Sequence, residues 1–217
     1  MPAQNIFRWR DGRGWLVFSS EAQPDSEVRG LALGRAAADG AVACVALSRN
    51  PAAADRLLDD VEDLGAPSGY IVDVFSEDDP TLRDRLGEAG VIIIATDFSA
   101  EGVRSTLTGA AVEGMEAAFS NGAIVLVEGA AASAFGTWIF RGDGTVGQGF
   151  DWLTNSVVLT DASGVAEQAR EIFMQERESI GIAVGPRSAI AFGPDGEIET
   201  WGARDVTVAL AAQFHER

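Results

Sequence analysis

Short apolar runs alternate with amphipathic stretches along most of the 217 residues, and this alternation most constrains the fold. The apolar runs predict strands over residues 16–18, 42–47, 70–74, 91–95 and 124–127. The stretches between them carry apolar residues at helical spacing and predict helices over 27–39, 52–64 and 100–121. Strands that are apolar throughout are typical of a parallel sheet covered on both faces. The alternation therefore predicts a doubly wound α/β fold with a mostly parallel sheet flanked by helices.

The pattern changes after Phe140. Residues 141–151 are rich in glycine and predict a loop, so the GxGxxG match over 142–147 is not expected to bind a dinucleotide. The remaining segments predict a strand over 156–159, a helix over 165–178 and short strands over 182–184, 189–192, 198–201 and 206–210. Pro194-Asp195-Gly196 predicts a hairpin, so antiparallel strands are expected at one edge of the sheet. No linker or repeat interrupts residues 1–217, which predicts a single domain.

Charge and hydropathy exclude several classes of function. The formal net charge of −17 argues against nucleic acid or an anionic membrane as a partner, because both require a basic surface. No apolar run approaches the ~20 residues of a membrane span, and the first residues lack the apolar core of a secretory signal. A cytoplasmic location is therefore expected. All 16 basic residues are arginine, which excludes lysine-dependent chemistry such as Schiff bases and P-loops.

Two residue types that often serve in catalysis occur once each. Cys44 lies inside an apolar run, which predicts a buried, inert thiol. His215 lies near the C-terminal end of the sequence, where a solvent-exposed role is expected. Neither residue is predicted to be catalytic.

Residues 129–134, Gly-Ala-Ala-Ala-Ser-Ala, follow the apolar run 123–127 and precede a short helical stretch. A strand followed by a tight turn and a helix is where α/β hydrolases place their nucleophile. Small residues suit such a turn, because backbone and helix approach closely there. The centre of the predicted turn is Ala131, which has no nucleophilic atom.

From about Trp15 to Leu210 the chain resembles the cyanophycinase and peptidase E group of serine hydrolases, which have the class I glutamine amidotransferase-like fold. The elbow of that family reads roughly GTSAGA, and its serine falls on Ala131. A second family motif, TGGDQ, corresponds to residues 96–100, where both glycines are replaced. The family's histidine falls on Ala162 and its acid on Pro186. The resemblance thus implies an α/β hydrolase fold in which none of the three triad positions carries a catalytic residue.

Several polar residues are expected near the carboxyl ends of the strands, where open α/β sheets bind ligands. They are Thr96, Asp97, Ser99, Glu128, Ser133, Asp161 and Arg187. One interpretation is a retained binding pocket, in which Arg187 holds a carboxylate and Glu128 and Ser133 lie beside the elbow. The other is a set of solvated loop residues and helix caps, with Ser99 and Ser163 as N-caps.

Two functional hypotheses follow. The first is a catalytically inactive homologue with a binding, regulatory or structural role. The second is a serine-type hydrolase whose nucleophile has moved to Ser133 or Ser99, assisted by Asp161 or Glu128. A carboxylate is a poor base for a hydroxyl at neutral pH, since its ordinary pKa is about 4.

No cofactor is predicted. No metal site is predicted either, because Asp97, Glu128 and Asp161 do not form a recognisable metal-binding pattern. The resemblance implies a homodimer and a small peptide or amino-acid-like ligand.

Overall fold

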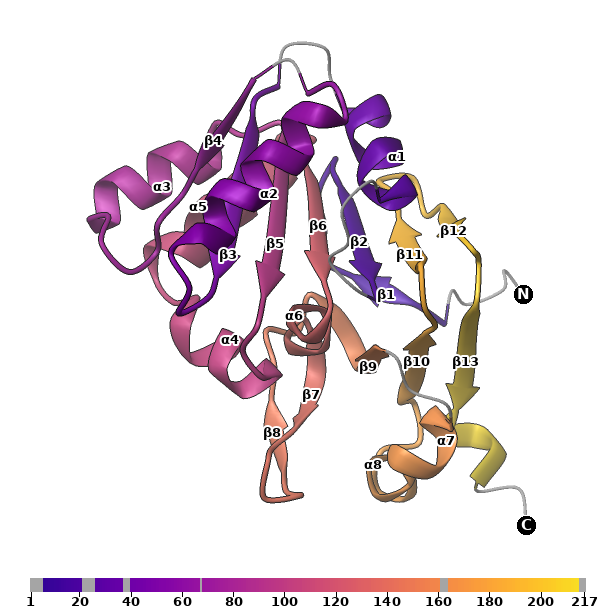
Figure 1. The fold of residues 1–217 in the computed structure, drawn as a ribbon. Helices are drawn as coiled ribbons and strands as arrows, with labels where there is room; N and C mark the ends of the chain where they lie inside the picture. Colours follow the sequence, from indigo (N-terminus) through magenta and orange to yellow (C-terminus); the bar gives the residue numbers. More distant parts are fainter. Residues whose placement is uncertain (1–5, 21–25, 37–39, 67, 161–163, 215–217) are drawn as a thin grey trace.

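The computed structural model describes residues 6–20, 26–36, 40–66, 68–160 and 164–214, and the described strands form two sheets (Figure 1). The first sheet consists, in spatial order, of β12 (Ile198–Gly202), β11 (Ser188–Phe192), β2 (Trp15–Ser19), β6 (Ile124–Glu128), β5 (Val91–Thr96), β3 (Val42–Leu47) and β4 (Gly69–Ile71). The five strands from β2 to β4 run parallel, whereas β11 and β12 are antiparallel to their neighbours. The predicted α/β fold, with antiparallel strands at one edge of a mostly parallel sheet, is confirmed.

The remaining described strands form a second sheet. It consists of β13 (Val206–Leu210), β10 (Ile180–Val184), β9 (Leu153–Thr160), β7 (Gly136–Phe140) and β8 (Val146–Gln148), with β1 (Arg8–Trp9) paired to β9. Sequence patterns alone placed β9, β10 and β13 in the first sheet. They separate from it because the two sheets bury apolar faces against each other: Phe18 and Ile190 of the first share one core with Val158 and Ile182 of the second.

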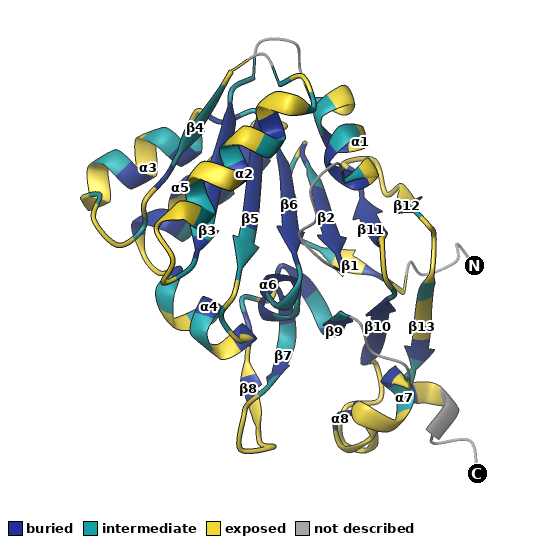
Figure 2. Ribbon diagram, viewed as in Figure 1, coloured by how far each residue is buried: buried dark blue, intermediate teal, exposed yellow. Residues whose placement is uncertain are grey.

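Helices cover both faces of the first sheet. The helices of the described residues are α1 (Glu27–Arg35), α2 (Ala52–Asp63), α3 (Asp79–Gly87), α4 (Ala100–Thr106), α5 (Ala110–Ser120), α6 (Ala130–Ala134), α7 (Val165–Gln168), α8 (Arg170–Gln175) and the 3₁₀ turn η1 (Ala211–Phe214). Helices α1 and α2 bury Val28 and Leu57 on one face, while α3 and α5 bury Leu86 and Met115 on the other. Figure 2 shows buried strands between helices whose outer sides are exposed. None of the described helices is long and apolar enough to span a membrane.

The helix predictions were correct in place but not always in extent. The helix predicted over 100–121 is two helices, because Gly109 has φ +52°, a backbone conformation that a regular helix does not contain. The helix predicted over 165–178 is α7 and α8, joined at Ala169. Strand β8 lies within the predicted loop 141–151. The single-domain prediction for 1–217 includes residues outside the described ranges and stays a prediction.

Helix α3 was missed, because Asp79-Pro80 is also typical of a turn. Pro80 lies in the first turn of the helix, where its missing N–H costs no hydrogen bond. The Asp78 side chain caps the helix by accepting a hydrogen bond from the Thr81 N–H at 2.8 Å. Asp79-Pro80 therefore begins a helix here.

Helices α3 and α5 approach closely at Gly114, which gives a test of the packing. A Cβ at Gly114 would lie 2.8 Å from Leu86 Cβ and 2.9 Å from the Arg83 carbonyl oxygen, so the helices would have to separate. We expect Gly114→Ala to lower the free energy of unfolding by about 1–2 kcal/mol, despite alanine's better helix propensity. Gly30→Ala in α1 is the control, since no atom of the described residues lies within 4 Å of its added Cβ, and it should raise the free energy of unfolding by ~0.5–1 kcal/mol. Urea denaturation measures both, and equal effects would contradict this packing.

Candidate functional site

The turn between β6 and α6 has the geometry of a nucleophile elbow. Gly129 has φ +59° and ψ −139°, directly after the last residue of β6, and α6 begins at Ala130. In hydrolases with this elbow the residue in the sharp, strained turn is the nucleophile itself. Gly129 therefore has the backbone conformation of such a turn, two residues before Ala131, on which the sequence resemblance places the nucleophile. Ala131 is buried within α6.

Neither Gly129 nor Ala131 carries a nucleophilic atom. Residues 129–132 are glycine and alanines, and none has a hydroxyl or thiol. Among the described residues, a Cβ added at Gly129 would meet only the Ser20 carbonyl oxygen, at 3.8 Å, so these residues leave room for a side chain that the sequence lacks. The Gly129 N–H donates to the Ser19 carbonyl oxygen at 3.0 Å, which fixes the turn against β2.

The two alternative nucleophiles lie in ordinary helical positions. Ser99 is exposed and caps α4, accepting a hydrogen bond from the Gly102 N–H at 3.2 Å, so the predicted N-cap is confirmed. Ser133 is half-buried on α6.

Pro186 and Arg187 are exposed in the turn between β10 and β11, where Arg187 has φ +57°. The predictions for Asp161, Ala162, Ser163 and His215 fall outside the described residues.

Glu128, the last residue of β6, is fully buried and bound by one arginine. Arg29 of α1 donates from Nε to Oε1 and from Nη2 to Oε2, each at 2.8 Å, and from Nη1 to Asp60 of α2 at 3.1 Å. Arg29 and Glu128 are 2% and 0% exposed. A guanidinium has no acceptor, so a carboxyl group that accepts N–H bonds on both oxygens is ionised. Glu128 was predicted to line a pocket beside the elbow, whereas here its oxygens face Arg29.

Burial and ion pairing shift the pKa values of Glu128 and Arg29 in opposite directions. Burial raises the pKa of the Glu128 carboxyl, and the hydrogen bonds and charge of Arg29 oppose that rise. Burial lowers the pKa of Arg29, but the hydrogen bonds and charges of Glu128 and Asp60 outweigh it, so that pKa is raised. Sequence reasoning missed Arg29. The available signal was a carboxylate at the end of an apolar strand, which requires a partner but does not identify one.

A pocket of about 420 Å³ opens at the carboxyl ends of β3 and β5. Its lining consists of Arg29, Ala46, Ser48, Asn50, Ala53, Arg56, Leu57, Asp59, Asp60, Ala95, Thr96 and Asp97. Of the predicted site residues, the structure brings Thr96 and Asp97 to this pocket, while Glu128, Ser133 and Arg187 are not part of its lining. The Thr96 hydroxyl is hydrogen-bonded to backbone groups. It donates to the Leu47 carbonyl oxygen at 3.0 Å and accepts from the Phe98 N–H at 2.9 Å.

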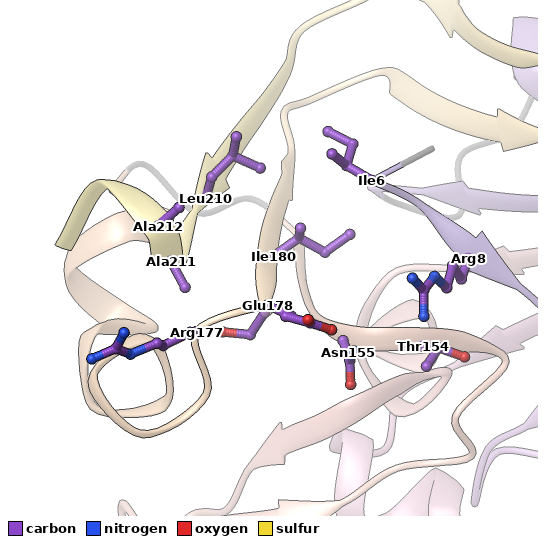
Figure 3. Close-up of a pocket in the computed structure, with 11 residues that line it drawn as sticks. Ile6, Arg8, Thr154, Asn155, Arg177, Glu178, Ile180, Leu210, Ala211 and Ala212 are labelled. Carbon is purple, nitrogen blue, oxygen red and sulfur yellow. The ribbon is translucent and has the colours of Figure 1, made fainter. Parts of the chain in front are cut away.

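A smaller pocket of about 210 Å³ lies in the second sheet, at the amino ends of β9 and β10. Figure 3 shows Arg8 and Arg177 on opposite sides of an apolar floor that includes Ile180 and Leu210. Ligands of open α/β sheets bind at the carboxyl ends of the strands, which is the opposite edge. Among the described residues, no group of three or more His, Cys, Asp or Glu side chains is arranged to hold a metal ion.

Comparisons with known proteins support the fold. No family model and no curated protein matches the sequence. The chain is similar in structure to a peptidase from an acI-B1 Actinobacterium, with TM-score 0.74 and 13% identity, over 97% of this chain and 94% of that one. It is also similar to a putative peptidase E protein from Listeria monocytogenes EGD-e, with TM-score 0.62 and 15% identity, over 86% of this chain and 97% of that one. At these identities the likeness shows a peptidase E-like fold.

The Arg29–Glu128 pair yields a stability prediction. Arg29→Met leaves the Glu128 carboxylate buried without its partner, and we expect a loss of about 3–5 kcal/mol in the free energy of unfolding. The double variant Arg29→Met with Glu128→Leu removes both charges, and it should recover most of that loss. Urea denaturation at pH 7 measures the three proteins, and a double variant less stable than Arg29→Met would contradict a mutual pairing.

Cys44 yields a reactivity prediction. The thiol is free and buried on β3, and burial raises its pKa to about 12. Since the thiolate is the reactive form, we expect almost no alkylation by iodoacetamide at pH 7–8.5 in the folded protein. In 6 M guanidinium chloride the same residue should react fully, as followed by intact mass. Rapid labelling of the folded protein would show an accessible thiol and contradict its position.

Proposed function

We propose that this chain is a non-hydrolytic relative of peptidase E-fold proteins, with a binding, regulatory or structural role. The elbow carries the proposal: the strained position after β6 is Gly129, and Ala130 and Ala131 follow it. A triad hydrolase that lacks its nucleophile and base loses most of its rate enhancement. The enhancement that remains over the uncatalysed reaction in water is about 10³–10⁴-fold. A site of this composition has no means of forming an acyl-enzyme.

The other triad positions support the same proposal. In the resemblance, the family's histidine and acid follow the strands here called β9 and β10. Pro186, at the acid position, lies two residues beyond the end of β10 and has no carboxylate. The position of the histidine is Ala162 in the sequence. Substitution at all three positions is more readily explained by loss of hydrolysis than by relocation of a single residue.

The arrangement of alternative groups supports the proposal further. Ser99 is engaged as a helix cap, and the carboxylate nearest the elbow in sequence, Glu128, is bound to Arg29 and is not free to accept a proton. Cys44 is protonated and buried. We further propose, on the resemblance, a cytoplasmic homodimer that binds a small peptide or amino-acid-like ligand.

Labelling with a fluorophosphonate probe tests the absence of a nucleophile. We expect no increase in intact mass for the folded protein, because no serine is activated. A serine hydrolase labelled in parallel is the positive control, and a far-UV circular dichroism spectrum establishes that the protein is folded. A stoichiometric adduct that Ser133→Ala or Ser99→Ala abolishes would show a displaced nucleophile and overturn the proposal.

A further inference from the structure

The pocket at β3 and β5 lies where the topology of the first sheet opens a crevice. After β3 the chain moves outward through α2 to β4, and after β4 it returns through α3 to β5 on the other side of β3. Helix α2 packs on one face of the sheet through Leu57, whereas α4, which follows β5, packs on the other through Val103. The chain segments leaving β3 and β5 therefore diverge. Such a switch point is where open α/β sheets bind ligands.

Small residues leave the pocket open. Ala46 of β3, Ala95 of β5, and Ala53 and Leu57 of α2 are part of its lining. These side chains are short or apolar, so the interior fits a short aliphatic chain. The volume of about 420 Å³ is within the range of small-molecule sites. This pocket lies at different strands from the elbow, which follows β6.

Two carboxylates at the pocket have an oxygen without a hydrogen-bond donor among the described residues. Ser48 donates its hydroxyl proton to Asp97 Oδ2 at 2.7 Å and accepts from the Asn50 N–H at 3.0 Å, which holds the Asp97 carboxylate at the mouth. Asp60 binds Arg29 through Oδ2 at 3.1 Å. Among the described residues, neither Asp97 Oδ1 nor Asp60 Oδ1 has a hydrogen-bond donor. Two carboxylate oxygens are thus available to a bound molecule.

Charge decides the class of ligand. Three carboxylates, those of Asp59, Asp60 and Asp97, line the pocket together with the guanidinium groups of Arg29 and Arg56. The charge of Arg29 is already matched by Glu128 behind it. The pocket therefore has an excess of negative charge, in a protein whose formal net charge is −17. The negative charge of the pocket and that of the whole protein both favour binding of a cation and disfavour binding of an anion.

We propose that this pocket binds a small aliphatic ammonium ion, with the ammonium group at Asp97 and Asp60 and the chain over Ala46 and Ala95. The assignment goes beyond the proposed function and does not depend on it, because no residue of the elbow takes part.

Isothermal titration calorimetry with putrescine tests the site, and 1,4-butanediol is the uncharged analogue of equal length. The titrations are made in 0.15 M NaCl. The Debye length at this ionic strength is about 8 Å, so screening weakens nonspecific binding of the diamine to scattered surface carboxylates. We expect saturable binding of putrescine at one site and at least tenfold weaker binding of the diol, because a charged hydrogen bond contributes more than a neutral one. Butanediol that binds as tightly as putrescine overturns the charge assignment.

Matched variants locate the site. Ala53→Leu fills the pocket without changing charge and should abolish binding, whereas Ala52→Leu changes the neighbouring exposed residue and should leave it intact. Asp97→Asn keeps an oxygen for Ser48 and removes only charge, so the dissociation constant should rise about tenfold or more. Asp195→Asn removes an exposed carboxylate at the β11–β12 turn and should have no effect.

The outcomes are distinct. Loss of binding in Ala53→Leu and a tenfold or larger dissociation constant in Asp97→Asn, with both controls unchanged and all variants folded by circular dichroism, support the site. Absence of saturable binding by the wild-type protein, or equal binding by Asp97→Asn and Asp195→Asn, overturns it. A fluorophosphonate adduct at a serine would overturn the proposed loss of hydrolysis and leave this test unaffected.

Discussion

A buried carboxylate at the end of β6 constrains everything around it. Glu128 is fully buried, and an ionised group in that position is tolerated only when it is paired and hydrogen-bonded. Arg29 satisfies both of its oxygens and also reaches Asp60, so a single guanidinium connects α1, β6 and α2. The same side chain is part of the lining of the neighbouring pocket. The ion pair that satisfies the buried carboxylate therefore also contributes to the surface of that pocket.

The second constraint is the space available to α6. Ala131, Ala132 and Ala134 are completely buried, and this short helix contacts β6 of the first sheet and β9 of the second. Larger side chains would force the two sheets apart, so the run of alanines is explained by packing alone. Gly129 is different, because no atom of the described residues lies closer than 3.8 Å to a Cβ there. Packing of the described residues therefore accounts for the small residues of the helix and does not account for the missing side chain at the turn.

The sequence predicted the fold well and the site less well, for physical reasons. Apolar runs identified the strands of the first sheet, because burial on both faces requires them to be apolar throughout. Periodicity has no information on which sheet a strand joins, so the separation of β9 and β10 into a second sheet was missed. Asp97 was placed correctly at a strand end, as its position in the chain dictates. Arg29 was missed because its pairing with Glu128 joins residues 99 positions apart, and only the fold brings them together.

The elbow and the pocket share an edge of the sheet because parallel strands end on the same side, yet they differ in what they can bind. At the elbow the described side chains offer no nucleophile, and the nearest carboxylate in sequence is held by Arg29. At β3 and β5 the loops diverge, and carboxylates and alanines line the same pocket. The crevice there depends on the direction in which the chain leaves each strand and not on which residue stands at the elbow. The proposed absence of hydrolysis at the elbow and the proposed binding site at β3 and β5 are therefore compatible within one fold.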